Sequence, residues 1–198
     1  LRRQRQMCIR DSYQGGYLAG KHLLELGHRR FLYLPGPKYN LSQTRRYAGI
    51  MDALSEANVP VSNVRQIDYH TVFGSPVPST SSYKSYEELF FPVDYTAVIG
   101  FNDLQSYSAM EILKERGYRI HEDISLISFD HLRKTHTYLP PLTSIADNTD
   151  KSIADTAVSI LLDKIKNSDS KFTGAVLPVT IYDGHTTGPV NKAFETSF

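Results

Sequence analysis

The stretch EDISLISFD, residues 122–130, is the most informative part of this sequence. Its apolar middle predicts a short buried strand, and its last residue, Asp130, is a carboxylate. A second stretch, YLPPLTSI at residues 138–145, predicts a return to another strand after two prolines. Open α/β sheets bind ligands beyond the carboxyl ends of their strands. We therefore expect Asp130 to lie where such a fold places its binding site.

The composition is that of an ordinary globular protein, with 198 residues, of which 40% are hydrophobic and 22% are charged. Four arginines fall within residues 1–12 against one aspartate, so the remainder carries 22 − 4 = 18 basic and 21 − 1 = 20 acidic residues. With slightly more acidic than basic residues, this part of the chain has no excess of positive charge that would indicate nucleic-acid binding. Cys8 is the only cysteine, which excludes a disulfide framework, and no apolar run reaches the roughly 18 residues that span a bilayer.

Residues 1–12 differ from the rest of the chain. They are polar and Arg-rich and lack the apolar segment of a secretory signal, and QRQMCIRDS resembles translated adapter sequence. We interpret them as a non-native leader and expect the fold to begin near residue 13. A basic arm for nucleic acid is the alternative.

From residue 13 the pattern alternates between helix and strand, which is typical of parallel βαβ units. Helices are expected at 13–26, 44–57, 83–91, 102–116 and 150–166, and strands at 31–34, 64–69, 96–101, 124–129, 142–145 and 175–181. Small residues at helical spacing, from Gly16 to Gly20, predict that the first helix lies close to the sheet. Ser42 or Thr44 is the expected cap of the second helix. Residues 70–82 predict an inserted or binding loop, and residues 185–198 carry no packing signal.

Polar side chains follow several of these strands. Asp130 is either a fixed acceptor for ligand hydroxyls or a helix cap. Asn102 offers donors and acceptors that suit a sugar, whereas Asp103 is the expected helix N-cap. Arg46 follows the strand that ends at Leu34, and its guanidinium suits ligand hydroxyls, a carboxylate or Asp130 itself.

Two further residues complete the list of candidates from chemistry alone. Arg45 is expected to be solvated. Tyr69 ends a strand and either stacks on a ligand ring or belongs to the core.

The sequence contains few motifs that are typical of enzymes. It contains no phosphate-binding loop, no His-Glu-x-x-His and no Gly-x-Ser-x-Gly, and its seven histidines are scattered. We therefore predict no catalytic residues, no cofactor and no metal site, although His131 and His136 leave a metal site as a weak alternative.

Six short stretches in order resemble the lactose/galactose repressor family of bacterial transcription regulators (LacI/GalR type). They are YQGGYLAG (13–20), LGHRR (26–30), RYAG (46–49), GFND (100–103), EDISLISFD (122–130) and PPLTSI (140–145). The resemblance covers about residues 13–182. It implies two Rossmann-like, parallel-sheet subdomains of the periplasmic-binding-protein type, the first of them incomplete here.

The resemblance also implies roles for individual residues. The family's effector contacts fall on Arg46, Asn102 and Asp130, on Tyr69 with less certain register, and on Ser42. Asp147 stands where the family often has glutamine, which makes it a sixth candidate and alters the expected recognition of hydroxyls. Gly184 replaces a frequent arginine.

The resemblance implies a division of the chain as well. Residues 13–60 would belong to the N-terminal subdomain and 61–128 to the C-terminal one. Residues 129–150 would cross back, 151–184 would add a final helix and strand to the C-terminal subdomain, and 185–198 would form a tail.

The predicted function is the effector-sensing and dimerisation core of a cytoplasmic DNA-binding regulator, with a sugar-like effector as ligand and operator DNA bound only through an N-terminal domain absent here. Ligand-driven closure of the subdomains would control operator binding. The rival is a periplasmic sugar-binding protein of a transport system, which a signal peptide in the gene would favour. A sugar- or nucleotide-modifying α/β enzyme is a third possibility, and measurable turnover would distinguish it.

Overall fold

The computed structural model describes residues 2–37, 39–67, 88–132, 136–147, 153–166 and 178–196. Its strands are β1 (Phe31–Leu34), β2 (Val64–Gln66), β3 (Ala97–Gly100), β4 (Ser125–Phe129), β5 (Ser144–Asp147) and β6 (Val179–Tyr182). They form one sheet in the order β2-β1-β3-β4-β5-β6, parallel throughout except where β6 runs against β5. The predicted α/β class with a mainly parallel sheet is confirmed.

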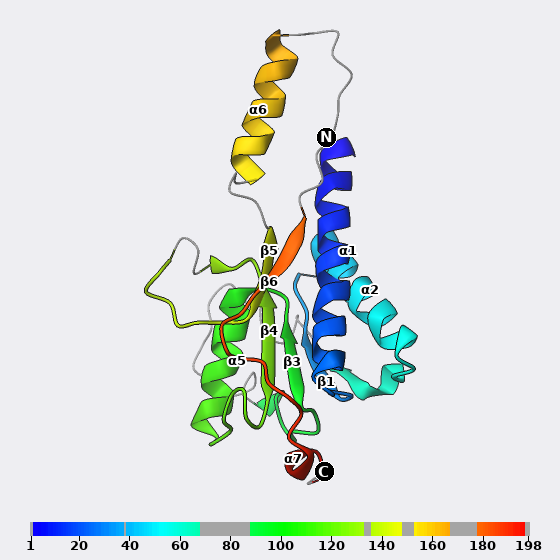
Figure 1. Cartoon of the computed structure of the whole chain (residues 1–198), viewed down its shortest axis with the longest axis vertical. Coiled ribbons are helices and arrows are strands. Elements are labelled where there is room, and N and C mark those ends of the chain that lie inside the picture. Colours follow the sequence, from blue (N-terminus) through cyan, green and yellow to red (C-terminus); the bar gives the residue numbers. More distant parts are fainter. Residues whose placement is uncertain are drawn as a thin grey trace.

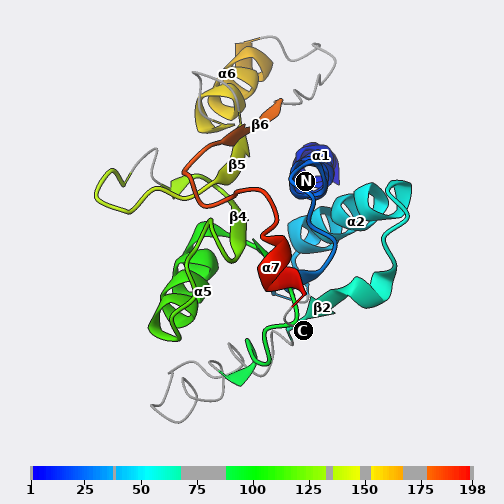
Figure 2. The same ribbon diagram turned by 60° about the horizontal axis from the view of Figure 1, so that its bottom comes forward.

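Helices cover both faces of this sheet (Figure 1). The helices of the described residues are α1 (Arg2–Glu25), α2 (Leu41–Glu56), a 3-10 turn at Val61–Asn63, α5 (Asp103–Glu115), α6 (Ile153–Lys166) and α7 (Lys192–Glu195). Figure 2 shows α1 and α2 on one side of the sheet and α5 on the other. The expected loop at 70–82 and most of the expected helix at 83–91 lie outside the described residues, as does Tyr69.

The strands β1, β3 and β4 are buried along their whole length because helices cover both faces of the sheet there, whereas no residue of β2 or β6 is fully buried. In β1, Leu32 packs in the core beneath α5, whereas Phe31 and Tyr33 pack in the core beneath α1 and α2. β3 alternates in the same way, with Val98 on the α5 side and Ile99 on the other. Because both faces of these strands are buried, the register of the strands is fixed. The residues that follow the parallel strands therefore lie together at the carboxyl-terminal edge of the sheet.

Glycines let α1 and α2 cross at very short distance. A Cβ added at Gly16 would lie 2.0 Å from the carbonyl oxygen of Arg46, and one at Gly49 would lie 2.1 Å from that of Tyr13. We expected the small residues of α1 to face the sheet. Ala19 does pack in the core with sheet residues, but Gly16 and Gly20 face α2. The crossing therefore locks the backbone that carries Arg46 against α1.

The structure differs from the predicted division of the chain at residues 60 and 128. β1 pairs with β2 on one side and with β3 on the other, and β4 continues the same sheet to β5. The βα alternation continues across residue 60 without a break, so these strands build one sheet rather than two. β5 was expected to return to a separate sheet and instead extends this one.

The helix α6 was predicted correctly, but its apolar face is not buried. It lies beyond the ends of β5 and β6 (Figure 1), and the side chains of Leu161 and Ile165 are 59% and 69% exposed. None of the helices in the described ranges has the length and apolar character needed to cross a membrane.

The C-terminal segment packs against the body, contrary to the expectation of a tail without packing. The amide of Leu126 donates to the carbonyl of Thr186 at 2.7 Å, and Val190 donates to Leu26 at 2.9 Å. Between these points the Gly188 carbonyl accepts from the buried His28 ring at 3.0 Å. Thr186 and Gly188 thus anchor the segment beside β4 by backbone hydrogen bonds, which an apolar pattern does not reveal.

Candidate functional site

The first turn of α2 supplies one wall of the site. The side chain of Asn40 caps the helix by accepting from the amides of Ser42 at 2.8 Å and Gln43 at 3.3 Å. The cap was expected at Ser42 or Thr44, so that prediction was wrong and the helix begins three residues earlier than expected. Because Asn40 does the capping, Ser42 lies inside the first turn, one turn before Arg46 on the same face of the helix.

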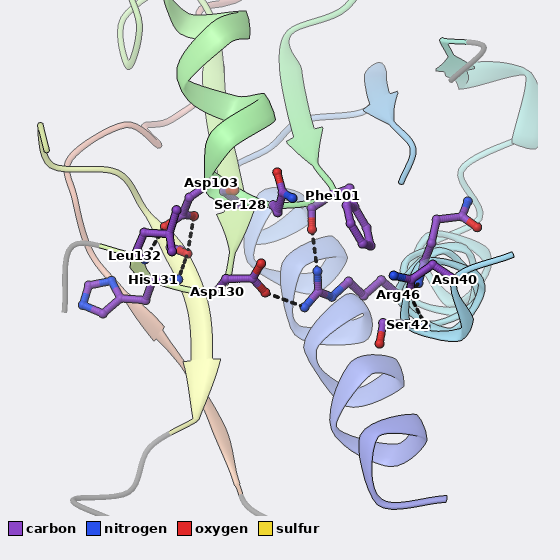
Figure 3. A network of polar contacts seen from close by, with 12 residues as sticks. Asn40, Ser42, Arg46, Phe101, Asp103, Ser128, Asp130, His131 and Leu132 are labelled. Carbon is purple, nitrogen blue, oxygen red and sulfur yellow. Dashed lines mark hydrogen bonds and ion pairs between the residues drawn. The ribbon is translucent and has the colours of Figure 1, made fainter. Parts of the chain in front are cut away.

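Arg46 is the central cation of the site (Figure 3). Its Nη2 donates to the Asp130 carboxylate at 2.8 Å, and its Nη1 donates to the Phe101 carbonyl. The guanidinium lies 5.0 Å from the ring centroid of Phe101 and 4.4 Å from that of Phe129, so it is held between two aromatic rings. Its side chain is only 14% exposed, and Arg45 is solvent-exposed as predicted.

Asp130 follows the last residue of β4 and faces Arg46 across the strand ends. Its amide continues the ladder to β5 by donating to the Ile145 carbonyl at 2.9 Å. Its backbone then turns into the left-handed region, with φ of +91°, which directs the carboxylate across the sheet edge. The side chain is 44% exposed, so it can reach a ligand while paired with Arg46.

The N-cap of α5 is Asn102 and not Asp103, so the prediction of Asp103 as the cap was wrong. Asn102 caps the helix through its Oδ1, which accepts from the Gln105 amide at 3.0 Å. Its Nδ2 can still donate to a ligand. Asp103 is instead buried, at 1% exposure, and accepts from the Ser144 hydroxyl and the Leu132 amide at 2.7 Å each. Burial raises the pKa of Asp103, and these hydrogen bonds oppose that rise.

The remaining candidates lie at different distances from this centre. Asp147 ends β5, where its carbonyl accepts from the Tyr182 hydroxyl at 2.8 Å. Tyr182 also stacks on the ring of His131, with centroids 4.1 Å apart and planes at 12°. The structure therefore brings Arg46 and Asp130 into direct contact and places Asp147 one strand further along the same sheet edge. No statement about Tyr69 follows from the described residues.

Sequence reasoning missed the two aromatic rings around Arg46. Both Phe101 and Phe129 come directly after or at the end of a predicted strand, one position before a polar candidate. This shared position in the sequence could have indicated that the two rings lie at the site. A strand-end aromatic beside a polar residue places a flat apolar surface next to a hydrogen-bonding group.

The assembled site offers a charged pair, an amide and two aromatic faces at one edge of a parallel sheet. In such a pair the carboxylate can accept a hydrogen bond from one hydroxyl of a ligand, and the guanidinium can donate one to the neighbouring hydroxyl. Such an arrangement suits a small polar molecule with adjacent hydroxyls. Among the described residues no three His, Cys, Asp or Glu side chains gather as metal ligands.

Comparison with known proteins gives this site a context. Residues 21–187 match the family described as "Periplasmic binding protein-like domain". The sequence is 31% identical over 166 residues to the "HTH-type transcriptional repressor PurR" of Mannheimia succiniciproducens, covering 83% of this chain and 48% of the relative. It is 35% identical over 162 residues to the PurR repressor of Escherichia coli O139:H28, covering 80% and 45%. The chain thus spans about half the length of these relatives.

Solved structures agree with the sequence matches. A LacI family transcriptional regulator from Enterococcus faecium with bound ribose is similar with a TM-score of 0.76 and 26% identity, over 91% of this chain and 65% of that one. A dimeric Lac repressor with a C-terminal deletion is similar with a TM-score of 0.72 and 27% identity, over 91% and 63%. A "periplasmic binding protein/LacI transcriptional regulator" from Alkaliphilus metalliredigens complexed with D-xylulofuranose is similar with a TM-score of 0.68 and 26% identity, over 89% of this chain and 64% of that one.

Proposed function

Since this chain belongs to the periplasmic binding protein-like domain family and is similar to the effector-binding core of LacI/GalR-type regulators, we propose that it senses a small-molecule effector for a DNA-binding transcriptional regulator. Its relatives are named as repressors, which favours regulation over transport. We assign it no catalytic activity and place it in the cytoplasm, where operator DNA is found.

The observation that carries this proposal is the pairing of Arg46 with Asp130 at the strand ends. The pair lies where open α/β sheets bind ligands, and half-buried Asn102 stands at the end of the neighbouring strand β3. Ribose and D-xylulofuranose are bound in similar proteins. A sugar-like molecule with adjacent hydroxyls is therefore the proposed effector, with Ser42, Tyr69 and Asp147 as further contacts.

The proposed output is a change in the affinity of a dimer for operator DNA. A ligand shifts a conformational equilibrium only when it binds the two states with different affinity. The effector would select one arrangement of the binding core, and this choice would set the spacing of two helix-turn-helix heads supplied by the N-terminal part of such regulators.

We propose that dimerisation uses the α5 side of the molecule. Leu104 is 64% exposed and Tyr138 is 80% exposed, and both are large side chains of apolar character. The Tyr107 hydroxyl donates to the Pro140 carbonyl at 2.9 Å, which joins α5 to the segment carrying Tyr138. A structurally similar Lac repressor is dimeric, which supports a contact between two copies of such a chain.

The test is direct titration of the purified protein with D-ribose and a panel of pentoses and hexoses by calorimetry. Asp130→Ala is expected to abolish the binding seen with the wild type while the circular dichroism spectrum stays the same. Arg45→Ala is the matched control, because it removes an exposed arginine next to Arg46 in the sequence and should bind normally. Unchanged affinity in Asp130→Ala would overturn the site, and a wild type that binds none of the sugars would overturn the ligand class.

A further inference from the structure

Two consecutive residues at the end of β4 have a backbone conformation that L-residues rarely adopt. Asp130 has φ of +91° and His131 has φ of +46°, and neither is glycine. Residues in this region cost free energy and persist only where the surroundings hold them. Something must therefore fix the turn that directs the Asp130 carboxylate towards Arg46.

The buried carboxylate of Asp103 holds this turn by two routes. Its Oδ2 accepts directly from the amide of Leu132 at 2.7 Å. Its Oδ1 accepts from the Ser144 hydroxyl at 2.7 Å, and the oxygen of that hydroxyl accepts from the amide of His131 at 2.9 Å. Asp103 and Ser144 are 1% and 0% exposed, so water does not compete for these bonds. The amides of two consecutive residues are thus tied to one carboxylate (Figure 3).

We propose that Asp103 is a positioning residue of the effector site, which fixes the turn after β4, directly and through Ser144, so that Asp130 meets Arg46 and the ligand. This inference rests on the proposed function for its binding readout. Asp103 is also the first residue of α5 and follows Asn102, so it joins the end of β3 to the end of β4 and to Ser144, the first residue of β5. The polar groups at these three points of the sheet are then held as one unit.

The chemistry favours a carboxylate over a neutral amide of the same shape. Both of the bonds that hold the turn come from donors, an amide N–H and a hydroxyl, and a carboxylate accepts through both oxygens. An asparagine at this position could accept from the Leu132 amide and donate to the Ser144 oxygen. Both routes would then consist of neutral hydrogen bonds, which are weaker than hydrogen bonds to a carboxylate, although the volume of the side chain is unchanged.

The first experiment needs no ligand. Amide hydrogen exchange of His131 and Leu132 is measured by NMR in the wild type and in Asp103→Asn. The exchange of these two amides is expected to accelerate at least about tenfold, while that of β4 residues stays the same. Ser106→Ala is the matched control, because Ser106 lies buried in the same cluster, 2.8 Å from the Ser128 hydroxyl, but bonds neither amide. Unchanged exchange at both amides in Asp103→Asn would overturn the proposal.

The second experiment measures binding of D-ribose, or of whichever sugar binds the wild type. Asp103→Asn is expected to weaken binding about tenfold or more, which corresponds to roughly 1.4 kcal/mol, and Ser106→Ala to leave it within about twofold. If both variants weakened sugar binding equally, Asp103 would only stabilise the fold in general, and the proposed positioning role would be wrong. If Asp103→Asn does not fold, Ser144→Ala removes one route alone and must accelerate exchange at His131. If no sugar binds the wild type, the proposed ligand class fails, and the exchange experiment alone decides the role of Asp103.

Discussion

His28 is expected to make the folded protein sensitive to mild acid. Its ring is 2% exposed and contacts groups from three separate segments. Nδ1 lies 2.9 Å from the Thr96 hydroxyl, and Nε2 lies 2.9 Å from the Ser125 hydroxyl and 3.0 Å from the Gly188 carbonyl. Since a carbonyl only accepts, Nε2 carries the proton and Nδ1 accepts from Thr96. Both nitrogens of the neutral ring therefore have hydrogen-bond partners. A second proton would create a positive charge in a buried site.

The magnitude follows from the pKa of this ring. Burial is the main cause that lowers the pKa of His28 from its ordinary 6.5 to about 4, with the nearby His22 and Arg29 adding to it and the Gly188 carbonyl opposing it. Because the folded state binds this proton less readily than the unfolded state does, acid favours unfolding. The contribution is fully present above about pH 6.5 and is lost as the pH falls towards about 4. Between about pH 7.5 and about pH 5 the loss comes to roughly 2 kcal/mol.

Urea denaturation at several pH values tests this expectation. Other groups titrate too, so the quantity to compare is the difference in free energy of unfolding between the wild type and His28→Gln at each pH. Glutamine retains a donor for the Gly188 carbonyl but does not ionise, and it should cost about 1–3 kcal/mol near pH 7.5. That difference should shrink by roughly 2 kcal/mol towards pH 5. A difference that stays constant with pH would refute the reasoning.

Two other expectations concern the helix crossing and the dimer surface. Gly16→Ala should destabilise the protein by about 1–3 kcal/mol in urea denaturation and weaken effector binding, because its Cβ would meet the backbone of Arg46. Gly15→Ala is the control, since its Cβ would lie 3.3 Å from the nearest atoms of Ile145 and Phe129 rather than 2.0 Å from a backbone oxygen, and an equal loss of stability in both variants would contradict the argument. Replacing Leu104 and Tyr138 together by lysine should shift the protein from dimer to monomer in sedimentation velocity with an unchanged far-ultraviolet spectrum. A dimer that persists would place the interface elsewhere.

The fold class and most elements were predictable because the strands are buried on both faces. A continuous apolar run bounded by polar residues is enough to locate β3 and β4. The order of strands was not predictable, since periodicity reports burial and says nothing of which strand pairs with which. The pairing of β1 with both β2 and β3 therefore contradicted a division drawn from motif order. The C-terminal segment was missed because it is held by backbone hydrogen bonds and by His28, not by an apolar face.

The centre of the site was predictable and the details of its support were not. The guanidinium of Arg46 was expected to suit ligand hydroxyls, a carboxylate or Asp130 itself, and it pairs with Asp130. Asn102 and Asp103 are adjacent and cap helices about equally well, so local chemistry could not choose between them. The choice is made by β5, whose Ser144 lies within reach of Asp103.

The ion pair at the centre of the site bears on how an effector can bind there. A ligand that had to separate Arg46 from Asp130 would leave a cation that is 14% exposed without its partner, which is costly in a half-buried setting. A hydroxyl avoids this cost, because it can donate to the carboxylate and accept from the guanidinium at once. Asp130 is 44% exposed and has acceptor positions beyond the one that Arg46 uses. The geometry thus favours a neutral polyol over an anionic ligand, since an anion would compete with Asp130 for Arg46 and place two negative charges side by side.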